Sequence, residues 1–258
     1  MTHWIRFENV GQARFGTLEG GVITVHEGDM FDSPTATPET VGIDDVRVLT
    51  PTQPSKMIAL WNNFHAMRIK ADLPVPEHPL FLLKAPNSFL ATGETIRRPA
   101  SYEGKVIYEG EIGIVIGKSC SGVSEAEAGD HIFGYTCIND VTAIDLLKAD
   151  ATFDQWVRAK SFDTFGVFGP VVATGLDPAG LSIRTVLNGD ERQNYPVSDM
   201  VIPPHSVVSQ LSQDMTLEPG DVICCGTSVG VGSMKEPSNS VEITIEGIGT
   251  LSNTYINE

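Results

Sequence analysis

Cysteine is scarce in this sequence, and long hydrophobic runs are missing. The four cysteines form no Cys-x-x-Cys pair, and the adjacent Cys224 and Cys225 would point to opposite faces of a strand. No stretch reaches the ~18 apolar residues of a membrane helix, and the N-terminal segment lacks the apolar core of a signal peptide. These absences argue for reduced thiols, no membrane partner and a cytoplasmic protein.

Positive charge is also in short supply. Lysine and arginine together number 17, against 33 aspartates and glutamates, which gives a formal net charge of −16. A surface of this sign repels phosphate backbones and anionic membranes, so nucleic acid is not expected as a partner. An acidic protein that acts on an anionic substrate needs local cations, supplied by a metal or by a few well-placed lysines and arginines.

The pattern of the chain predicts a mostly β fold. Its 258 residues can bury a substantial core without disulfides. Short β-like runs separated by glycines, then a Pro- and Thr-rich stretch at 33–40, predict a small β-rich domain over residues 1–52. Longer strands with Gly-rich turns predict an α+β catalytic domain over residues 53–258. The expected strands there include 56–60, 79–84, 106–117, 134–139, 171–174, 183–187, 222–225, 241–245 and 249–254, and the expected short helices are 63–71, 124–127, 141–148, 152–158 and 206–213.

Two acids alternate with apolar residues in the run from 106 to 117. Glu109 and Glu111 occupy odd positions, whereas the even positions are mostly apolar. Period-two alternation puts both carboxylates on one face of a strand, about 6–7 Å apart along it. Like charges at this spacing repel, and glutamate is a poor strand former. A hard cation would resolve the conflict, because Mg²⁺ and Ca²⁺ take carboxylate oxygens as ligands.

These acids and a third one, Asp140, also have ordinary interpretations. Glu109 and Glu111 could lie on the solvated face of an edge strand, and their spacing alone does not decide the matter. Asp140 ends the expected strand 134–139 and precedes an expected helix, a position at which aspartate is a common N-cap. The pattern by itself leaves both alternatives open.

Seven separate stretches, in order along the chain, resemble the fumarylacetoacetate hydrolase family. One such match would be weak, but seven in register are specific, and they span roughly residues 56–254. The N-terminal segment resembles the small domain of bacterial members similar to 2-hydroxyhepta-2,4-diene-1,7-dioate isomerases, 5-oxopent-3-ene-1,2,5-tricarboxylate decarboxylases and acylpyruvate hydrolases. The stretches are Phe-Leu-Leu-Lys-Ala-Pro-Asn at 81–87, Tyr-Glu-Gly-Glu at 108–111, 134–140, Lys-Ser-Phe-Asp at 160–163, 188–193, Thr-Leu-Glu-Pro-Gly-Asp at 216–221 and Gly-Thr-Ser-Val-Gly-Val-Gly at 226–232.

The resemblance implies a rolled β-sandwich, a homodimer and a divalent metal. The acids that match the family's ligands are Glu109, Glu111 and Asp140, and the expected cation is Mg²⁺ or Mn²⁺. Family substrates are 2-oxo acids or their enols, which chelate the metal. The metal then acts as a Lewis acid on the negative charge that builds up on the enolate oxygen.

The resemblance also implies roles for other side chains. Lys160 would add a positive charge beside the metal, and Thr227, in the Gly-rich loop, would contact a substrate carboxylate. His65 matches a catalytic histidine on a mobile lid, expected here over residues 62–78, where it would orient or deprotonate water.

Three positions depart from the family pattern. The glutamate that commonly follows the lid histidine by three residues is Arg68 here, so His65 would lose the carboxylate that orients it and raises its basicity. Four and seven residues after Asp140, polar substrate contacts become Ile144 and Leu147. We therefore expect a substrate with a less polar group, or one that another cation such as Arg68 or Arg158 orients.

Three functions follow from these observations. The first is a metal-dependent hydrolase that cleaves a C–C bond beside a ketone in a 2-oxo acid, such as an acylpyruvate. The second is an isomerase, tautomerase or decarboxylase of 2-oxo or hydroxydienoate diacids in aromatic catabolism, which needs enolate stabilisation but no activated water. The third is a non-catalytic protein that binds the metal and an oxo acid.

Overall fold

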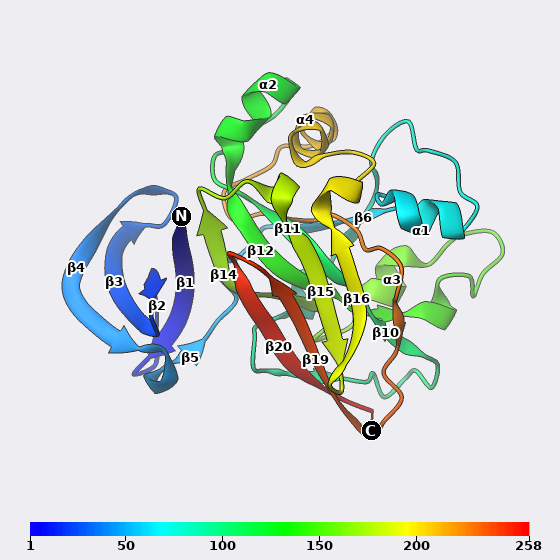
Figure 1. The fold of residues 1–258 in the computed structure, drawn as a ribbon, viewed down its shortest axis with the longest axis horizontal. Helices are drawn as coiled ribbons and strands as arrows, with labels where there is room; N and C mark the ends of the chain where they lie inside the picture. Colours follow the sequence, from blue (N-terminus) through cyan, green and yellow to red (C-terminus); the bar gives the residue numbers. More distant parts are fainter. Residues whose placement is uncertain (258) are drawn as a thin grey trace.

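One large sheet runs through the molecule, and Figure 1 shows its blue N-terminal strands to one side of its green central strands. The computed structural model describes residues 1–257. The 12 strands of this sheet include β5 (Arg47–Val48) beside β1 and β8 (Phe89–Leu90) beside β14. The other strands follow in the spatial order β4 (Asp32–Gly42), β3 (Val22–Asp29), β2 (Gln12–Glu19), β1 (Thr2–Asn9), β14 (Gly166–Thr174), β12 (Ile132–Asp140), β11 (Gly110–Ile116), β17 (Val222–Cys224), β6 (Met57–Trp61) and β7 (Leu80–Lys84).

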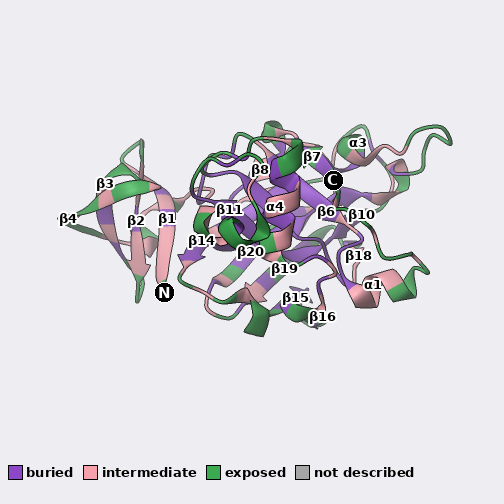
Figure 2. Cartoon of the chain, turned by 90° about the horizontal axis from the view of Figure 1, so that it is seen from above, coloured by how far each residue is buried: buried purple, intermediate pink, exposed green. Residues whose placement is uncertain are grey.

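Two smaller sheets complete the β structure, and the larger of them packs on β11, β12 and β14. Apolar side chains fill the space between the layers. Figure 2 colours much of the central strands as buried. The mostly β sandwich predicted from the sequence is confirmed. The five-stranded sheet has the order β16 (Asp190–Pro196), β15 (Ser182–Leu187), β19 (Ser238–Ile245), β20 (Gly249–Ile256) and β9 (Thr95–Arg97), and the three-stranded sheet has the order β13 (Thr142–Ala143), β10 (Val106–Tyr108) and β18 (Gly232–Ser233).

The N-terminal strands extend the large sheet, because β1 pairs with β14. Aromatic rings join the two regions, and the Phe31 ring lies 4.9 Å from the Phe133 ring, centroid to centroid. The Pro- and Thr-rich stretch forms part of β4, an edge strand. An edge strand tolerates Pro34 and Pro38 because one of its sides needs no donors for the hydrogen-bond ladder.

The helices are short and lie around the sheets. They are α1 (His65–Lys70), α2 (Glu125–Ala128), α3 (Trp156–Lys160) and α4 (Pro204–Asp214). The predicted capping box is present before α2, where the Glu127 carboxylate accepts a hydrogen bond from the Ser124 amide at 3.0 Å. No helix within residues 1–257 is long and apolar enough to cross a membrane.

The helix expected at 141–148 is wrong. Residues 142 and 143 form β13, which pairs with β10 through Ile107 and Thr142, so the backbone there is extended. A single 3-10 turn, η4 (Ile144–Leu146), follows. The local helical pattern loses to this pairing because the pairing anchors a polar side chain, that of Thr142, in the site described next.

Candidate metal centre

Strand register brings three acidic side chains together. β11 and β12 are antiparallel, with Glu111 opposite Ile138, so Glu109 lies beside Asp140. The Asp140 amide donates a hydrogen bond to the Glu109 carbonyl at 2.9 Å. Glu109, Glu111 and Asp140 each offer a carboxylate oxygen, and these oxygens lie within 4.8 Å of one another. The residues proposed as metal ligands therefore form one cluster.

Burial separates this cluster from a solvated strand face. Every residue of β11 is buried, and Glu111 and Asp140 are 0% and 1% exposed. Burial raises the pKa of Glu111 well above its usual range, and the neighbouring Asp140 and Glu109 carboxylates raise it further. Burial also raises the pKa of Glu109, although the Lys160 ammonium opposes this effect. The alternative of an exposed edge strand is wrong.

Two buried lysines compensate part of the negative charge. The Lys160 ammonium lies 2.6 Å from Asp140 Oδ2 and 3.0 Å from Glu109 Oε2. It also lies 2.7 Å from the hydroxyl oxygen of Thr142. The Lys84 ammonium donates to the other Asp140 oxygen, Oδ1. Asp140 is thus the last residue of β12, held by two lysines, and the interpretation as a helix N-cap is wrong.

The charges of this cluster are coupled. Burial alone would raise the pKa of Asp140, but Lys160 and Lys84 outweigh it and lower that pKa. Burial alone would lower the pKa of Lys160, but the carboxylates of Asp140 and Glu109 outweigh it and raise that pKa. The raised pKa keeps Lys160 a cation, and its ammonium donates to Glu109, Asp140 and the Thr142 hydroxyl.

One oxygen of the cluster has no hydrogen-bond partner. Glu111 Oε2 accepts from the Gly226 amide at 2.8 Å, whereas Glu111 Oε1 is buried and has no partner among residues 1–257. A buried anionic oxygen without a partner is costly. The three carboxylates and the two ammonium groups leave a formal charge of −1. Such a set of hard oxygen donors fits a divalent cation, either Mg²⁺ or Mn²⁺.

The glycine-rich loop after β17 lies against the strand that carries the acids. The Thr227 hydroxyl donates to the Gly110 carbonyl at 3.0 Å. Gln193 donates to the Thr227 hydroxyl at 2.9 Å and accepts from the Gly110 amide at 3.0 Å. Gly226 has φ 91°, a left-handed conformation that favours glycine. Gln193 therefore fixes the loop to the backbone between the two glutamates.

The sequence analysis gave no role to Lys84 or Gln193. Both lie within stretches that carry the family resemblance, which was the available signal. Their partners, Asp140 and Thr227, are distant in sequence, so only the fold shows what they contact.

The other expected residues are not part of the cluster. His65 is the half-buried first residue of α1, and Figure 2 shows α1 and α3 on opposite sides of β6 and β10. The Arg68 guanidinium donates to the Leu73 carbonyl at 3.0 Å, which ties it to the loop after α1. Arg158 is exposed on α3, two residues before Lys160 and so on a different side of that helix. The structure therefore brings Lys160 to the acids but not Arg158.

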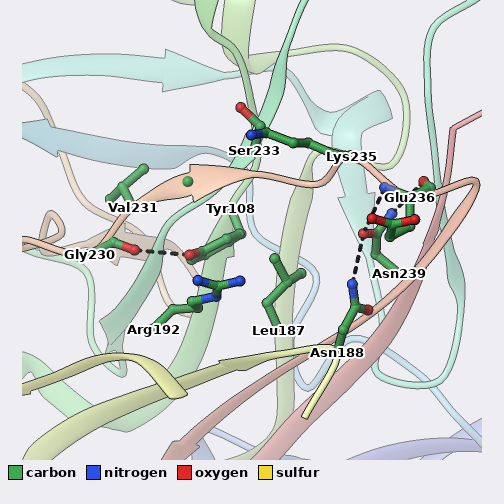
Figure 3. A pocket seen from close by; sticks show the side chains of 11 residues that line it. Tyr108, Leu187, Asn188, Arg192, Gly230, Val231, Ser233, Lys235, Glu236 and Asn239 are labelled. Atoms are coloured by element: carbon green, nitrogen blue, oxygen red, sulfur yellow. Dashed lines mark hydrogen bonds between the residues drawn. The ribbon is translucent and has the colours of Figure 1, made fainter. Parts of the chain in front are cut away.

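A separate cavity lies next to Tyr108 and is shown in Figure 3. It has a volume of about 260 Å³, and the Tyr108 hydroxyl donates to the Gly230 carbonyl at 2.9 Å on its wall. Arg192 lies beside Tyr108 in this view. None of Glu109, Glu111 or Asp140 lines this cavity, although Tyr108 directly precedes Glu109.

Comparisons with known proteins agree with this geometry. Residues 56–256 match the model of the fumarylacetoacetate (FAA) hydrolase C-terminal domain, and residues 2–51 match Rv2993c-like, N-terminal. Oxaloacetate tautomerase YisK of Bacillus subtilis is 37% identical over 82% of this chain and 73% of its own. The crystal structure of 2-hydroxyhepta-2,4-diene-1,7-dioate isomerase from Mycobacterium marinum has a TM-score of 0.90, 36% identity, and coverage of 99% of this chain and 98% of its own. Maleylpyruvate hydrolase from Sphingobium sp. SYK-6, in complex with manganese (II) ion and pyruvate, has a TM-score of 0.79, 25% identity and coverage of 99% of both chains.

Proposed function

Because this chain belongs to the fumarylacetoacetate hydrolase family, we propose that it is a divalent-metal-dependent enzyme that interconverts the keto and enol forms of a 2-oxo acid. The observation that carries this proposal is the buried cluster of Glu109, Glu111 and Asp140, with Lys160 bound to two of these acids and one Glu111 oxygen left without a partner. A relative described as a tautomerase and a solved structure described as an isomerase support it.

The acids of the cluster would bind the metal, and Lys160 would supply a second positive charge. Glu109, Glu111 and Asp140 would hold the cation, which when bound supplies a Lewis acid for the negative charge of the enolate oxygen. Lys160, held by Glu109 and Asp140, keeps a second positive charge at the same place. The backbone donors of the loop would bind the substrate carboxylate, and the Thr227 hydroxyl would join them by releasing the Gly110 carbonyl.

The reaction itself moves one proton. A proton leaves carbon 3 of the 2-oxo acid, and a proton joins the oxygen on carbon 2, so no other atom is gained or lost. We assign the transfer at carbon 3 to His65, the half-buried first residue of α1.

Tautomerisation fits the surroundings of His65 better than hydrolysis does. Hydrolysis needs an activated water, and a histidine does this best with a carboxylate that fixes its orientation. Among residues 1–257 no hydrogen bond joins His65 to a carboxylate, and Arg68 occupies the position one turn along α1. The C–C hydrolysis expected from the sequence stays a second candidate, supported by the likeness to maleylpyruvate hydrolase.

The test is a pair of assays on protein freed of metal by a chelator. Enol disappearance is followed by ultraviolet absorbance, and pyruvate release from acetylpyruvate is followed in parallel, each with and without added Mg²⁺ or Mn²⁺. The proposal expects a metal-dependent acceleration of the first reaction. Pyruvate release without tautomerisation would instead support the hydrolase. If neither reaction occurred, the remaining candidate would be a binding protein.

A further inference from the structure

A second cavity, apolar in character, is lined by residues close in sequence to side chains that contact the carboxylate cluster. Its volume is about 570 Å³, within the range of ~300–1,000 Å³ usual for small-molecule sites. Eight of its ten lining residues are apolar. The two charged ones, Lys148 and Asp154, lie 2.5 Å apart and form an ion pair with each other. The cavity wall therefore offers apolar contact and no unpaired cation.

Strand β7 contributes one residue to the cavity wall and another to the carboxylate cluster. Leu82 lines the cavity, and Lys84, two residues on, faces the same side of β7, about 6–7 Å further along the strand. Lys84 contacts Asp140. The apolar surface thus begins next to a residue that touches one of the acids.

Two other segments also carry both a residue that lines the cavity and a residue that contacts the carboxylate cluster. Trp156 lines the cavity and lies one turn before Lys160 on α3, so both side chains share a face of that helix. Ile144 also lines the cavity, two residues after Thr142, whose hydroxyl donates to Glu109 at 2.9 Å. Three independent segments therefore place the cavity beside the groups that would hold the metal and substrate.

Aromatic rings and the segment of His65 complete the wall. The rings of Trp61 and Trp156 lie 4.9 Å apart, centroid to centroid, with their planes tilted by 46°, and together they form an aromatic corner of the wall. Leu73 contributes from the loop after α1, and its carbonyl accepts the Arg68 hydrogen bond. The helix that begins at His65 is thereby linked to the cavity.

Resting on the proposed function, we propose that the substrate is a 2-oxo acid with an apolar substituent on carbon 3, an aryl or branched alkyl group, which this cavity receives. Its oxo acid end reaches the cluster and its apolar end fills the cavity. A diacid is disfavoured, because the lining residues offer its second carboxylate no unpaired cation, and Arg68, whose guanidinium donates to the Leu73 carbonyl, does not itself line the cavity. Lys148 is largely exposed to solvent, and its ammonium lies 2.5 Å from Asp154.

Binding distinguishes these substrates without requiring turnover. The affinities of phenylpyruvate and oxaloacetate are measured by isothermal titration calorimetry on the intact protein with saturating Mg²⁺. Phenylpyruvate is expected to bind about tenfold or more tightly, a factor typical of small apolar groups in a pocket. Equal affinities, or tighter binding of oxaloacetate, would overturn the inference.

Variants locate the preference in the cavity. Ile144→Arg places a cation on the wall, and it should weaken phenylpyruvate binding about tenfold and strengthen oxaloacetate binding. Val157→Arg is the matched control, because Val157 is exposed on α3 and does not line this cavity. Ile144→Ala covers the case in which the arginine variant fails to fold, and it should weaken only phenylpyruvate binding. An unchanged ratio of affinities in either Ile144 variant contradicts the inference.

A parallel assay separates this inference from the proposed function. Exchange of the carbon 3 protons for deuterium is followed by NMR with the same two acids. Tight phenylpyruvate binding without exchange would keep the inference and reject the tautomerase. Exchange of oxaloacetate alone would keep the tautomerase and reject the apolar substrate.

Discussion

The carboxylate cluster and the apolar cavity adjoin each other, yet the chain builds them in opposite ways. The acids of the cluster lie on β11 and β12 and at the entry to β11, in the buried centre of the large sheet. The cavity wall comes from strand ends, the turn η4, α3 and the loop after α1. On the proposed function, strand register would fix the chemistry, whereas peripheral segments would set the choice of substrate. The two should respond separately to mutation.

Removal of Lys160 should give the largest effect and act on the cluster alone. Lys160→Met leaves Glu109 and Asp140 without their shared cation and removes a positive charge from the enolate. We expect kcat for tautomerisation to fall about 100- to 1,000-fold. The affinity for phenylpyruvate relative to oxaloacetate should keep its value, and a change in that ratio would show that the two regions are coupled.

Removal of Lys84 should separate stability from metal affinity. Lys84 contacts Asp140 but neither glutamate, so Lys84→Met takes the formal charge of the cluster from −1 to −2. Breaking a buried pair costs about 3–5 kcal/mol, so the metal-free variant should unfold at lower urea concentration. The extra negative charge should at the same time tighten Mn²⁺ binding. Weaker Mn²⁺ binding in a folded variant would mean that Lys84 orients Asp140 and does not merely compensate its charge.

Restoration of a carboxylate near His65 should shift the reaction. Residue 68 lies one turn after His65 on α1, so Arg68→Glu provides the partner that an attacking water requires. We expect pyruvate release from acetylpyruvate to rise about tenfold, less than the ~100- to 10,000-fold that general acid–base catalysis contributes in full, because the substitution only supplies a partner to His65. Arg68→Gln is the control, since it removes the cation without adding a carboxylate. An equal rise in both variants would assign the effect to lost positive charge.

The smallest effect should appear in hydrogen exchange. Within the segment 62–78, residues 62–64 are buried and tied to the body, for example by the Asn63 side-chain amide, which donates to the Cys225 carbonyl at 3.0 Å, whereas residues 71–78 are mostly exposed. We predict fast exchange there without ligand and slower exchange with oxalate and Mg²⁺, while β11 stays protected in both states. Slow exchange of this segment in the free protein would argue against a lid.

What could be predicted from the sequence also differs between the carboxylate cluster and its surroundings. The alternation of Glu109 and Glu111 predicts a shared face, and the family resemblance supplies Asp140 and Lys160, which the structure joins to them. Period-two patterns do not reveal whether a strand is central or at an edge, so burial of the acids needed the fold. The failed helix at 141–148 has a similar cause, because the pairing of β13 with β10 depends on residues far apart in sequence.

Contacts between distant strands of the sheets also could not be predicted from the sequence. Lys84 contacts Asp140, and Gln193 contacts Gly110, only once the strands are assembled. The sequence showed that Ile144 and Leu147 are apolar. It did not show that Lys148 pairs with Asp154, which leaves no unpaired cation among the residues that line the cavity.

The most direct test of the account is Mn²⁺ binding to chelator-treated protein, measured by calorimetry for the parent and for Glu111→Gln. The amide keeps the shape of the side chain but removes the charge of the carboxylate whose Oε1 has no partner among residues 1–257. The account predicts one site per chain in the parent and binding at least about 100-fold weaker in the variant, beyond the 10- to 100-fold typical of residues that only support a ligand. Equal affinity in the two proteins, or no binding to the parent, would contradict it.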